Sequence, residues 1–283
     1  MKLFKTSKGI VLAHNFRNYL LEEAWDTIIN QPRLFDFLST QVLDEKYIDD
    51  TVFLSMTDHF IQAPISKQEV WAAGVTYLRS RDARMEESKD SGGADFYSKV
   101  YHAERPELFF KALPHRVAAH KEKVFIRNDS KWNVPEPELT LFINSNGEIQ
   151  GYTIGNDMSS RDIEGENPLY LPQAKVYEKS AALGPCLYVP EQPISLDTTI
   201  SIVIQRDGTA VFNNEIQLNR MKRNFSELAE YLFRECDFEH GVFLMTGTGI
   251  VPPNDFTLHV DDTIEISIDN IGTLANTVAY KNT

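Results

Sequence analysis

The middle of the chain alternates apolar and other side chains with a period of two. Leu139, Leu141 and Ile143 occupy every second position of one run, and the tetrapeptide Asn-Ser-Asn-Gly follows at 144–147. A period of two is typical of a strand with one buried face, and this tetrapeptide is typical of a hairpin turn. The pattern therefore predicts an antiparallel hairpin whose second strand returns to end at Asp157.

Further apolar runs predict more strands than helices after residue 65. Strands are expected within 70–77, 106–111, 116–125, 200–205, 241–249 and 263–268. One helix is well marked, because Asn224 is a favoured N-cap residue and Glu227 follows three residues later, as in a capping box. The balance of elements predicts a strand-dominated α+β fold.

Residues 1–65 are expected to form a small N-terminal domain, and residues 66–283 a larger one that carries the chemistry. Apolar side chains at helical spacing over 15–37 predict two short helices or one that ends near Asn30, because a proline interrupts the pattern. Residues 51–54 are expected to form a short strand. The N-terminal part shows no residues at catalytic spacing.

Composition changes the expected partners. The chain of 283 residues carries a net charge of −13, which argues against nucleic acid or an anionic membrane surface as a partner. A small anionic substrate then needs local positive charge in order to bind.

The chain has two cysteines, Cys186 and Cys236, which form no disulfide framework and suit a reducing cytosol. No apolar run approaches the roughly 18 residues that span a bilayer, so we expect a cytoplasmic protein.

Three carboxylates are placed to converge at one end of the predicted hairpin. Glu136 and Glu138 are two residues apart on an extended segment, so their side chains leave on the same face. Prolines 135 and 137 favour that extended backbone. The returning strand ends at Asp157, level with the start of the first strand. Carboxylate oxygens are the ligands of hard cations, so the hairpin predicts a divalent-metal site.

A charge-dense helix is expected at 78–88, directly after a buried strand that ends at Gly74. Such a run usually forms a solvated face, but sites of α/β proteins often lie where a buried strand ends. Both interpretations stay open, and in the second one of the charges of this helix faces a pocket, the candidates being Arg79, Arg81, Asp82, Arg84, Glu86 and Glu87. The Ser-Gly-Gly-Ala-Asp sequence at 91–95 predicts a flexible turn that is a candidate tip of a lid.

Several ordered motifs from about residue 65 to the end resemble those of the fumarylacetoacetate hydrolase superfamily. They are Pro-Glu-Pro-Glu-Leu at 135–139, Gly-Tyr-Thr-Ile-Gly-Asn-Asp-Met-Ser-Ser-Arg-Asp at 151–162, Lys175 through Gly184-Pro185, Leu-Met-Thr-Gly-Thr-Gly at 244–249, and the stretches 260–264 and 271–276. The resemblance implies a mixed, rolled β-fold and a bound Mg²⁺ or Mn²⁺. It implies metal ligands at Glu136, Glu138 and Asp157, an active-site lysine at Lys175 and a substrate-contacting threonine at Thr248.

Two departures from the family pattern change the expected reaction. Hydrolases of the superfamily usually carry a water-activating histidine a few residues after a Gly-x-x-Tyr motif. Here Gly-Val-Thr-Tyr at 74–77 is followed by Ser80 at the place where that histidine is sought. The segment 161–175 resembles instead the branch that dehydrates 2-keto-3-deoxy sugar acids, including 2-keto-3-deoxy-D-arabinonate and -xylonate dehydratases.

The resemblance implies dehydration of a 2-keto-3-deoxypentonate to 2,5-dioxopentanoate. A divalent metal acidifies the C3 protons, and Lys175 is the candidate base, since a nearby dication lowers the pKa of its ammonium. The C4 hydroxyl needs an acid, for which Glu107 and Glu86 are candidates by placement, and the protonated Lys175 or a metal-bound water would serve as well. Arg79, Gln173 and Thr248 are the candidates to hold the substrate carboxylate and hydroxyls.

Two other functions stay open from the sequence. One is a metal-dependent hydrolase of acylpyruvate- or fumarylacetoacetate-type C–C bonds, with His102 replacing the missing base. The other is a non-catalytic protein that binds a sugar acid. In each case the expected ligand is a small 2-keto acid, with no nucleic acid or membrane partner. The family resemblance implies a homodimer or homotetramer.

Overall fold

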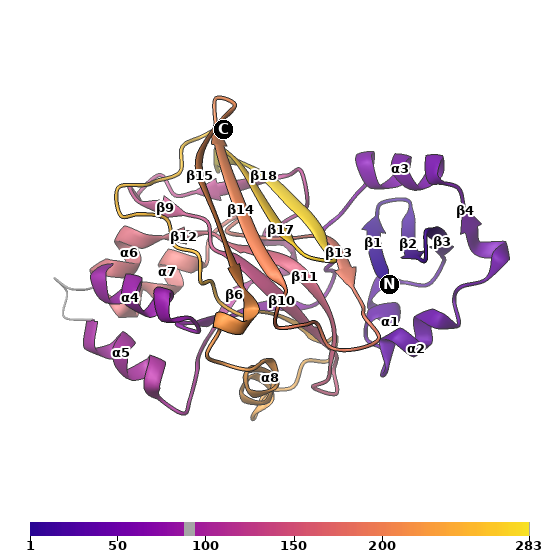
Figure 1. The fold of residues 1–283 in the computed structure, drawn as a ribbon, viewed down its shortest axis with the longest axis horizontal. Helices are drawn as coiled ribbons and strands as arrows, with labels where there is room; N and C mark the ends of the chain where they lie inside the picture. The colour runs from indigo at the N-terminus through magenta and orange to yellow at the C-terminus, as the bar shows by residue number, and fades with distance from the viewer. Residues whose placement is uncertain (88–93, 283) are drawn as a thin grey trace.

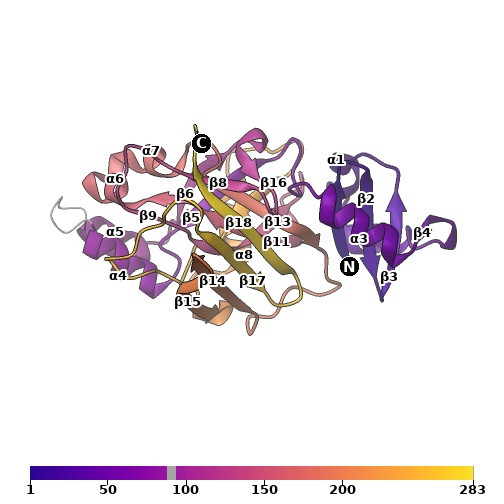
Figure 2. The same ribbon diagram turned by 90° about the horizontal axis from the view of Figure 1, so that it is seen from above.

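The computed structural model describes residues 1–87 and 94–282, and it contains two large β-sheets (Figures 1 and 2). The larger sheet has eleven strands among the described residues, in the order β4-β3-β2-β1-β13-β11-β10-β16-β5-β6, with β7 beside β13. Its strands are β1 (Lys2–Thr6), β2 (Gly9–His14), β3 (Arg17–Leu21), β4 (Tyr47–Ile48), β5 (Glu69–Gly74), β6 (Glu107–Ala112), β7 (Val117–Ala118), β10 (Pro137–Ile143), β11 (Ile149–Asp157), β13 (Ala181–Tyr188) and β16 (Val242–Met245).

The second sheet has five strands in the order β15-β14-β17-β18-β8. They are β8 (Lys123–Ile126), β14 (Thr199–Arg206), β15 (Thr209–Gln217), β17 (Thr263–Ile268) and β18 (Gly272–Tyr280), and a separate short pair joins β9 (Asn133–Val134) to β12 (Ser159–Ser160). Both sheets mix parallel and antiparallel neighbours, as the pairs β16–β5 and β18–β8 are parallel. The strand-dominated α+β fold with mixed sheets is confirmed.

The helices lie around the sheets, and α4, α5, α6 and α7 gather at one end of the molecule (Figure 1). The helices are α1 (Trp25–Ile29), α2 (Leu34–Ser39), α3 (Asp50–His59), α4 (Leu78–Glu87), α5 (Ala94–His102), α6 (Arg161–Glu166), α7 (Leu171–Lys175) and α8 (Phe225–Phe233). The α8 helix begins where the sequence predicts it, since the Asn224 side chain accepts a 2.6 Å hydrogen bond from the Glu227 N–H. The candidate lid tip falls largely on residues 88–93, which lie outside the described residues.

The predicted hairpin is formed by β10 and β11, and its two faces have different neighbours. The apolar residues at alternate positions, such as Leu139 and Leu141, belong to the hydrophobic core shared with isoleucines of β14 and β17. Phe142 faces the other way, into a second core that includes the first helices. Glu138, four positions earlier, is therefore on the Phe142 face, at the end of the sheet near α4 and α6.

The N-terminal region differs from the sequence prediction in two places. Part of the expected helical segment is β3, which pairs with β2 and β4, and only α1 and α2 are helical. The expected strand at 51–54 lies inside α3, because the Asp49 side chain accepts a hydrogen bond from the Val52 N–H and caps that helix. Cap chemistry and strand pairing outweighed the local apolar pattern in each place.

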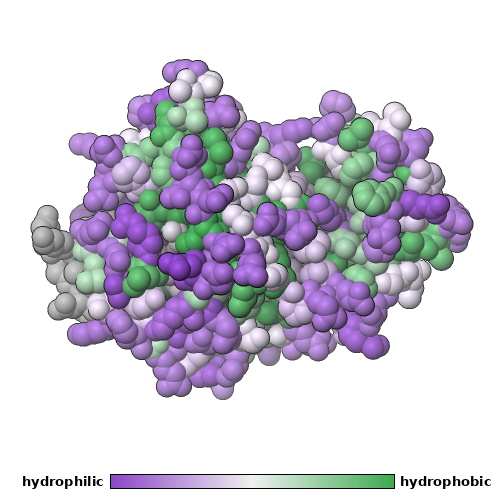
Figure 3. Space-filling view, viewed as in Figure 1, coloured by the Kyte–Doolittle hydropathy of each residue, from purple (hydrophilic) through white to green (hydrophobic). Residues whose placement is uncertain are grey.

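The N-terminal strands are joined to the rest of the fold and form a distinct lobe in Figure 1. Strand β1 pairs with β13 through Lys2↔Tyr188 and Leu3↔Leu187, and one hydrophobic core includes residues of both regions. Whether residues 1–65 fold as an independent domain stays a prediction. Hydrophilic side chains cover much of the face in Figure 3, and no helix among the described residues is long and apolar enough to cross a membrane.

Candidate active site and metal centre

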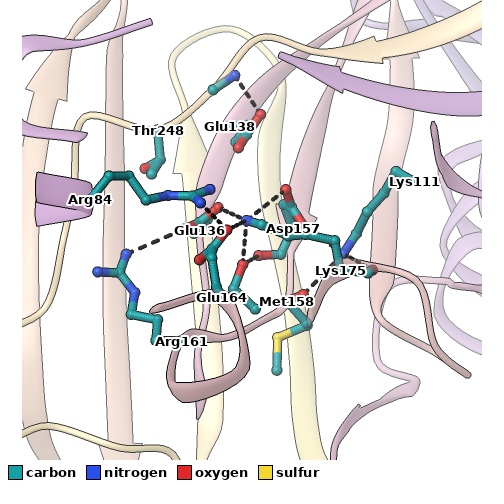
Figure 4. Close-up of polar contacts among 12 residues, drawn as sticks. Arg84, Lys111, Glu136, Glu138, Asp157, Met158, Arg161, Glu164, Lys175 and Thr248 are labelled. Atoms are coloured by element: carbon teal, nitrogen blue, oxygen red, sulfur yellow. Dashed lines mark hydrogen bonds and ion pairs between the residues drawn. The ribbon is translucent and has the colours of Figure 1, made fainter. Parts of the chain in front are cut away.

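Three buried carboxylates meet at the open end of the β10–β11 hairpin (Figure 4). Glu136, Glu138 and Asp157 each offer an oxygen that lies within 4.8 Å of the other two. The backbone fixes this arrangement, because the Asp157 N–H donates to the Glu136 carbonyl at 3.0 Å and Glu138 lies opposite Gly155 in the strand pairing. The residues that the hairpin pattern predicted to converge do so. We call these three carboxylates the triad, and the side of the site that they form the strand wall.

The turn after β16 holds one of these carboxylates. The Gly247 N–H donates to Glu138 Oε2 at 2.5 Å. Gly247 has a φ of +91°, and a Cβ there would lie 2.1 Å from the Thr76 hydroxyl oxygen, so this turn requires glycine. The Gly-Thr-Gly turn therefore binds a carboxylate of its own chain.

Lys175, the last residue of α7, places its ammonium against the strand wall. Its Nζ lies 2.5 Å from Glu136 Oε2, 3.2 Å from Asp157 Oδ2 and 2.5 Å from the hydroxyl of Ser159. Burial opposes the charge on Lys175, but nearby carboxylates outweigh burial and raise the pKa of the ammonium above its usual value. In this arrangement Lys175 neutralises part of the negative charge of the three carboxylates.

A second buried lysine, Lys111 at the end of β6, supports the strand wall from the other side. Its Nζ lies 2.5 Å from Asp157 Oδ1 and donates to the carbonyls of Met158 at 2.9 Å and Lys175 at 2.5 Å. One fully buried ammonium thus links the candidate metal ligand Asp157 to the helix that carries Lys175. The sequence interpretation took Lys111 only as the charged end of a strand.

Two helices supply a further buried ion pair beside the triad. Arg84 of α4 contacts Glu164 of α6 through Nη1 and Oε1, and Glu164 Oε1 lies 3.9 Å from the Lys175 Nζ. Arg84 is 5% exposed and Glu164 is 1% exposed. We call the Arg84–Glu164 pair the helical wall. Arg161, at the start of α6, donates to Glu136 Oε1 at 3.3 Å.

The neighbours give the two glutamates of the triad opposite electrostatic environments. Burial alone raises the pKa of Glu136, but Lys175 and two arginines outweigh it and lower that pKa to about 2. Burial raises the pKa of Glu138 well above its usual value, and the negative charges of Asp157 and Glu136 raise it further. A buried group of carboxylates that repel one another is a site for a cation, since the cation relieves that repulsion.

Two of the predicted substrate and acid residues lie at this site. Thr248 lines the same cavity as the triad. Its hydroxyl donates a hydrogen bond to the Ile250 carbonyl and accepts one from the Ile250 N–H. Glu107 of β6 places its Oε2 against Gly74, where a Cβ would be only 1.9 Å away. Burial raises the pKa of Glu107, and the negative charge of Glu164 adds to this while Arg84 opposes it.

The structure does not bring the remaining predicted residues to the site. Arg79 and Glu86 form a 3.7 Å ion pair on the exposed face of α4, and Gln173 is exposed on α7. His102, the alternative base, is exposed on α5 and its Nδ1 lies 2.8 Å from the Ser98 carbonyl. Arg79 and Glu86 thus form a surface pair, whereas Arg84, another of the charges that the sequence offered on this helix, lines the cavity at the triad.

Ser80 has a structural use at the place where a hydrolase histidine was sought. Its hydroxyl donates to the Tyr77 carbonyl at 2.8 Å and accepts from the Tyr77 N–H at 3.2 Å, at the start of α4. Ser80 also lines the cavity next to the triad. A serine bound in this way offers no imidazole to activate water.

The helical spacing of Arg84 relative to Ser80 is the feature of the sequence that indicates a place for Arg84 at the cavity. Ser80 and Arg84 are four residues apart and share a face of α4 that points into the cavity. Arg79 and Arg84 are five residues apart, which turns them about 140° from each other. Arg161 and Glu164 lie in the segment quoted for the family resemblance, where the sequence assigned them no role.

The cavity at the triad is small. It has a free volume of about 20 Å³, which is room for about one water molecule or ion. Larger cavities lie elsewhere, and one of about 740 Å³ is lined by α8 and the hairpin turn, away from the carboxylates. A sugar acid is much larger than the cavity at the triad, so its binding requires lining side chains to move.

The comparisons with known proteins agree with this geometry. Residues 70–279 match the family described as fumarylacetoacetate (FAA) hydrolase C-terminal. The chain belongs to this family, which confirms the resemblance seen in the sequence motifs.

Two curated relatives are similar over most of the chain. A probable 2-keto-3-deoxyxylonate dehydratase of Haloferax volcanii is 43% identical over 246 residues, covering 86% of this chain and 82% of the relative. A 2-dehydro-3-deoxy-D-arabinonate dehydratase of Saccharolobus solfataricus is 44% identical over 227 residues, covering 79% and 76%. The predicted kinship to the branch that dehydrates sugar acids is confirmed.

A solved structure is similar over nearly the whole chain. It is 2-keto-3-deoxy-D-arabinonate dehydratase complexed with magnesium and 2,5-dioxopentanoate, with a TM-score of 0.84 and 34% identity, covering 99% of both chains. A hexagonal crystal form of 2-keto-3-deoxyarabinonate dehydratase gives a TM-score of 0.87 at 35% identity, covering 100% of both chains. The likeness extends to the N-terminal region, beyond the residues that match the family.

Proposed function

We propose that this protein is a Mg²⁺-dependent hydro-lyase that dehydrates a 2-keto-3-deoxypentonate to 2,5-dioxopentanoate. The observation that carries the proposal is the contact of Lys175 with the buried carboxylate triad. The relatives named as sugar-acid dehydratases and the related magnesium complex support the substrate class and the metal.

Glu136, Glu138 and Asp157 would hold the divalent cation, Mg²⁺ or Mn²⁺. All three are oxygen donors on a fixed backbone, which suits a hard cation, and their mutual repulsion favours its binding. A divalent cation held there would polarise the 2-keto group, make the C3 protons more acidic and disfavour the ammonium form of Lys175.

Lys175 is the proposed base. Its Nζ lies at the triad and is held by Ser159, so a 2-keto group oriented at the triad brings C3 close to this amine. Lys111 fixes the carbonyl of Lys175 and the carboxylate of Asp157 together, which keeps the amine in register with the metal ligands. Lys111 is thus a positioning residue for the base.

Glu107 is the proposed acid for the departing C4 hydroxyl, in preference to Glu86. Burial raises the pKa of Glu107, so its carboxyl keeps a proton to a higher pH than an exposed glutamate does. Glu86 is exposed and paired with Arg79 on the surface of α4. Thr248 remains a candidate to hold the substrate, whereas Arg79 and Gln173 are exposed.

The proposed reaction loses one molecule of water. The C3–H bond breaks and its proton passes to Lys175, while the electron pair forms a C3–C4 double bond as the C4–O bond breaks. Glu107 supplies the proton with which the hydroxyl leaves as water. Loss of a C5 proton and addition of a proton at C3 move the double bond to C4 and C5, and the resulting enol tautomerises to the aldehyde.

Incubation of the protein and Mg²⁺ with a 2-keto-3-deoxypentonate tests the reaction. We expect a semialdehyde product, and we expect no cleavage of an acylpyruvate by the same sample. Cleavage of the acylpyruvate without semialdehyde formation would establish the hydrolase, and tight binding of the sugar acid without turnover would establish the non-catalytic binding protein.

Exchange of the C3 protons with deuterated solvent tests Lys175 separately from water loss. In Lys175→Met this exchange is expected to slow by about 10²–10⁴-fold, the usual contribution of a general base. Mg²⁺ should still bind, since the three carboxylates remain. Exchange at the rate of the unaltered protein would remove Lys175 as the base.

We also propose a homodimer or homotetramer in the cytoplasm. The oligomer is the expectation for the family, and light scattering on the purified protein measures it. Two unpaired cysteines, one buried and one exposed, are compatible with a reducing compartment.

A further inference from the structure

The helical wall holds a buried carboxylate whose hydrogen-bonding capacity is unused. Glu164 is 1% exposed, and neither of its side-chain oxygens has a hydrogen-bond partner among the described residues. Its Oε1 is in ionic contact with Arg84, which leaves Oε2 without a donor. Buried polar groups are nearly always paired, so this oxygen calls for an explanation.

The position of Glu164 points to a ligand as the missing donor. Its Oε1 lies 3.9 Å from the Nζ of Lys175, the proposed base, and its partner Arg84 lines the same cavity as the triad. Figure 4 shows Glu164 beside Glu136, with Arg84 and Arg161 approaching from the side opposite Lys111. A substrate bound at the triad would therefore pass close to this carboxylate.

A purely structural role for the Arg84–Glu164 pair leaves part of the arrangement unexplained. A buried ion pair is favourable only when the remaining lone pairs also find partners. The Oε2 of Glu107 is likewise buried without a hydrogen-bond partner in the part of the chain that the structure describes, and the charges of Arg84 and Glu164 act on Glu107. This side of the site thus offers two buried carboxyl groups to the hydroxyls of a sugar acid, Glu164 as an acceptor and Glu107, in its proposed role, as the proton donor.

We propose that Glu164, held in place by Arg84, accepts a hydrogen bond from the terminal C5 hydroxyl of the substrate. This inference rests on the proposed function, in which Glu107 serves the C4 hydroxyl and leaves C5 as the other free hydroxyl of a pentonate. Glu164 is then a specificity-determining residue. It favours 2-keto acids that carry a hydroxyl at this end and repels those that carry a carboxylate there.

Calorimetric titration of the Mg²⁺-saturated protein with two five-carbon ligands tests this role without turnover. The ligands are 5-hydroxy-2-oxopentanoate, which lacks the C4 hydroxyl and cannot be dehydrated, and 2-oxoglutarate, which carries a carboxylate at C5. The unaltered protein is expected to bind the hydroxylated ligand at least about tenfold more tightly, since bonds to charged acceptors are strong.

Glu164→Gln is expected to reduce the preference for the hydroxylated ligand over 2-oxoglutarate by about tenfold. The amide removes the negative charge and leaves Arg84 to attract a carboxylate, so 2-oxoglutarate should bind about tenfold more tightly than to the unaltered protein. A gain of binding cannot result from a damaged fold. Glu166→Gln, an exposed position on the same helix, is the matched control and should leave both affinities unchanged.

Glu164→Asp gives an independent measurement if the amide variant is unstable. The aspartate keeps the negative charge that pairs with Arg84, but its side chain is one methylene shorter, so its carboxylate lies farther from the ligand. Binding of 5-hydroxy-2-oxopentanoate should weaken about tenfold while 2-oxoglutarate stays excluded.

Two outcomes separate this inference from the proposed function. If Glu164→Gln leaves the ratio of the two affinities within twofold of the unaltered protein, Glu164 is only the partner of Arg84 and the inference is wrong. If the ratio changes as expected but no sugar acid is dehydrated, the inference stands and the proposed reaction fails.

Discussion

The strand wall and the helical wall face the same cavity but are held in place by different means. In the strand wall, the backbone pairing of β10 with β11 sets the positions of Glu136, Glu138 and Asp157 independently of side-chain contacts. In the helical wall, a side-chain ion pair joins Arg84 of α4 to Glu164 of α6, two helices that are far apart in the chain. Backbone register makes the proposed metal site rigid, whereas in the proposed specificity pair a substitution can change the substrate that is bound while leaving the three carboxylates in place.

The strongest test of the strand wall removes its buried support. Lys111→Met leaves the Asp157 carboxylate and two backbone carbonyls without their buried cation. We expect the free energy of unfolding to fall by about 3–5 kcal/mol, the usual effect of breaking a buried ion pair. Denaturant unfolding measures it.

Lys179→Met is the matched control, because Lys179 pairs with Glu122 near the surface. It should change the stability by no more than about 1 kcal/mol. Equal losses in the two variants would mean that Lys111 does not support the strand wall in the way the contacts suggest.

The next test removes one ligand of the strand wall. Glu138→Gln keeps the shape of the side chain and an acceptor for Gly247, but it removes one negative charge from the triad. We expect Mg²⁺ affinity to fall by more than about 100-fold, since outer partners of metal ligands alone are worth about 10–100-fold. Calorimetry with Mg²⁺ measures this, and affinity within tenfold of the unaltered protein would contradict the site.

The same variant tests the raised pKa of Glu138 in metal-free protein. A carboxyl whose pKa is higher in the folded than in the unfolded state stabilises the fold when protonated, and this stability is lost as the pH rises above the ordinary glutamate pKa of 4.5. Glu138→Gln should therefore gain stability relative to the unaltered protein as the pH increases from 4.5 toward neutrality. Thermal unfolding across this range should show the two curves diverging in that direction.

A smaller effect is expected where α4 begins. Ser80→Ala removes the hydroxyl that bonds both the N–H and the carbonyl of Tyr77. We expect a loss of about 1 kcal/mol in the free energy of unfolding, as for other buried hydrogen bonds. Mg²⁺ affinity should stay the same, because the pairing of β10 with β11 holds the three carboxylates and Ser80 contacts none of them. A large loss of Mg²⁺ affinity would show that the two walls are coupled.

The smallest effects are expected on the exposed face of α4. Arg79→Ala and Glu86→Gln each remove one member of a surface ion pair. Their unfolding free energies should change by no more than about 0.5 kcal/mol, and steady-state kinetics should give kcat within about twofold of the unaltered protein. A tenfold loss of kcat in either variant would restore the sequence prediction that these residues act at the site.

Local sequence was a good guide wherever neighbouring residues alone determine the geometry. The period of two and the Asn-rich turn predicted β10 and β11, and the two-residue spacing of Glu136 and Glu138 placed both on one face. The N-cap at Asn224 likewise predicted the start of α8. Each of these features depends on contacts between residues that are close in sequence or joined by one short turn.

Local sequence was a poor guide where distant partners compete with local preference. The apolar spacing around residue 20 is compatible with a helix, but pairing with β2 and β4 makes Arg17–Leu21 a strand. On α4 many charged residues have equal helical preference, so composition did not distinguish Arg84 from Arg79. Helical spacing separates the faces of the two arginines, and the position of Glu164 on another helix gives the buried one its ion-pair partner.

The sequence by itself determined the family, the hairpin and the three carboxylates that converge on it. The tertiary structure alone decided which cations accompany them: Lys111 of β6 and Arg161 of α6 contact the triad, and Arg84 of α4 pairs with Glu164 beside it. The physical reason is the range of the forces. The strand pairing of a hairpin joins segments that are close in sequence. A buried charge can instead pair with an opposite charge from any part of the chain that the fold brings within a few ångströms.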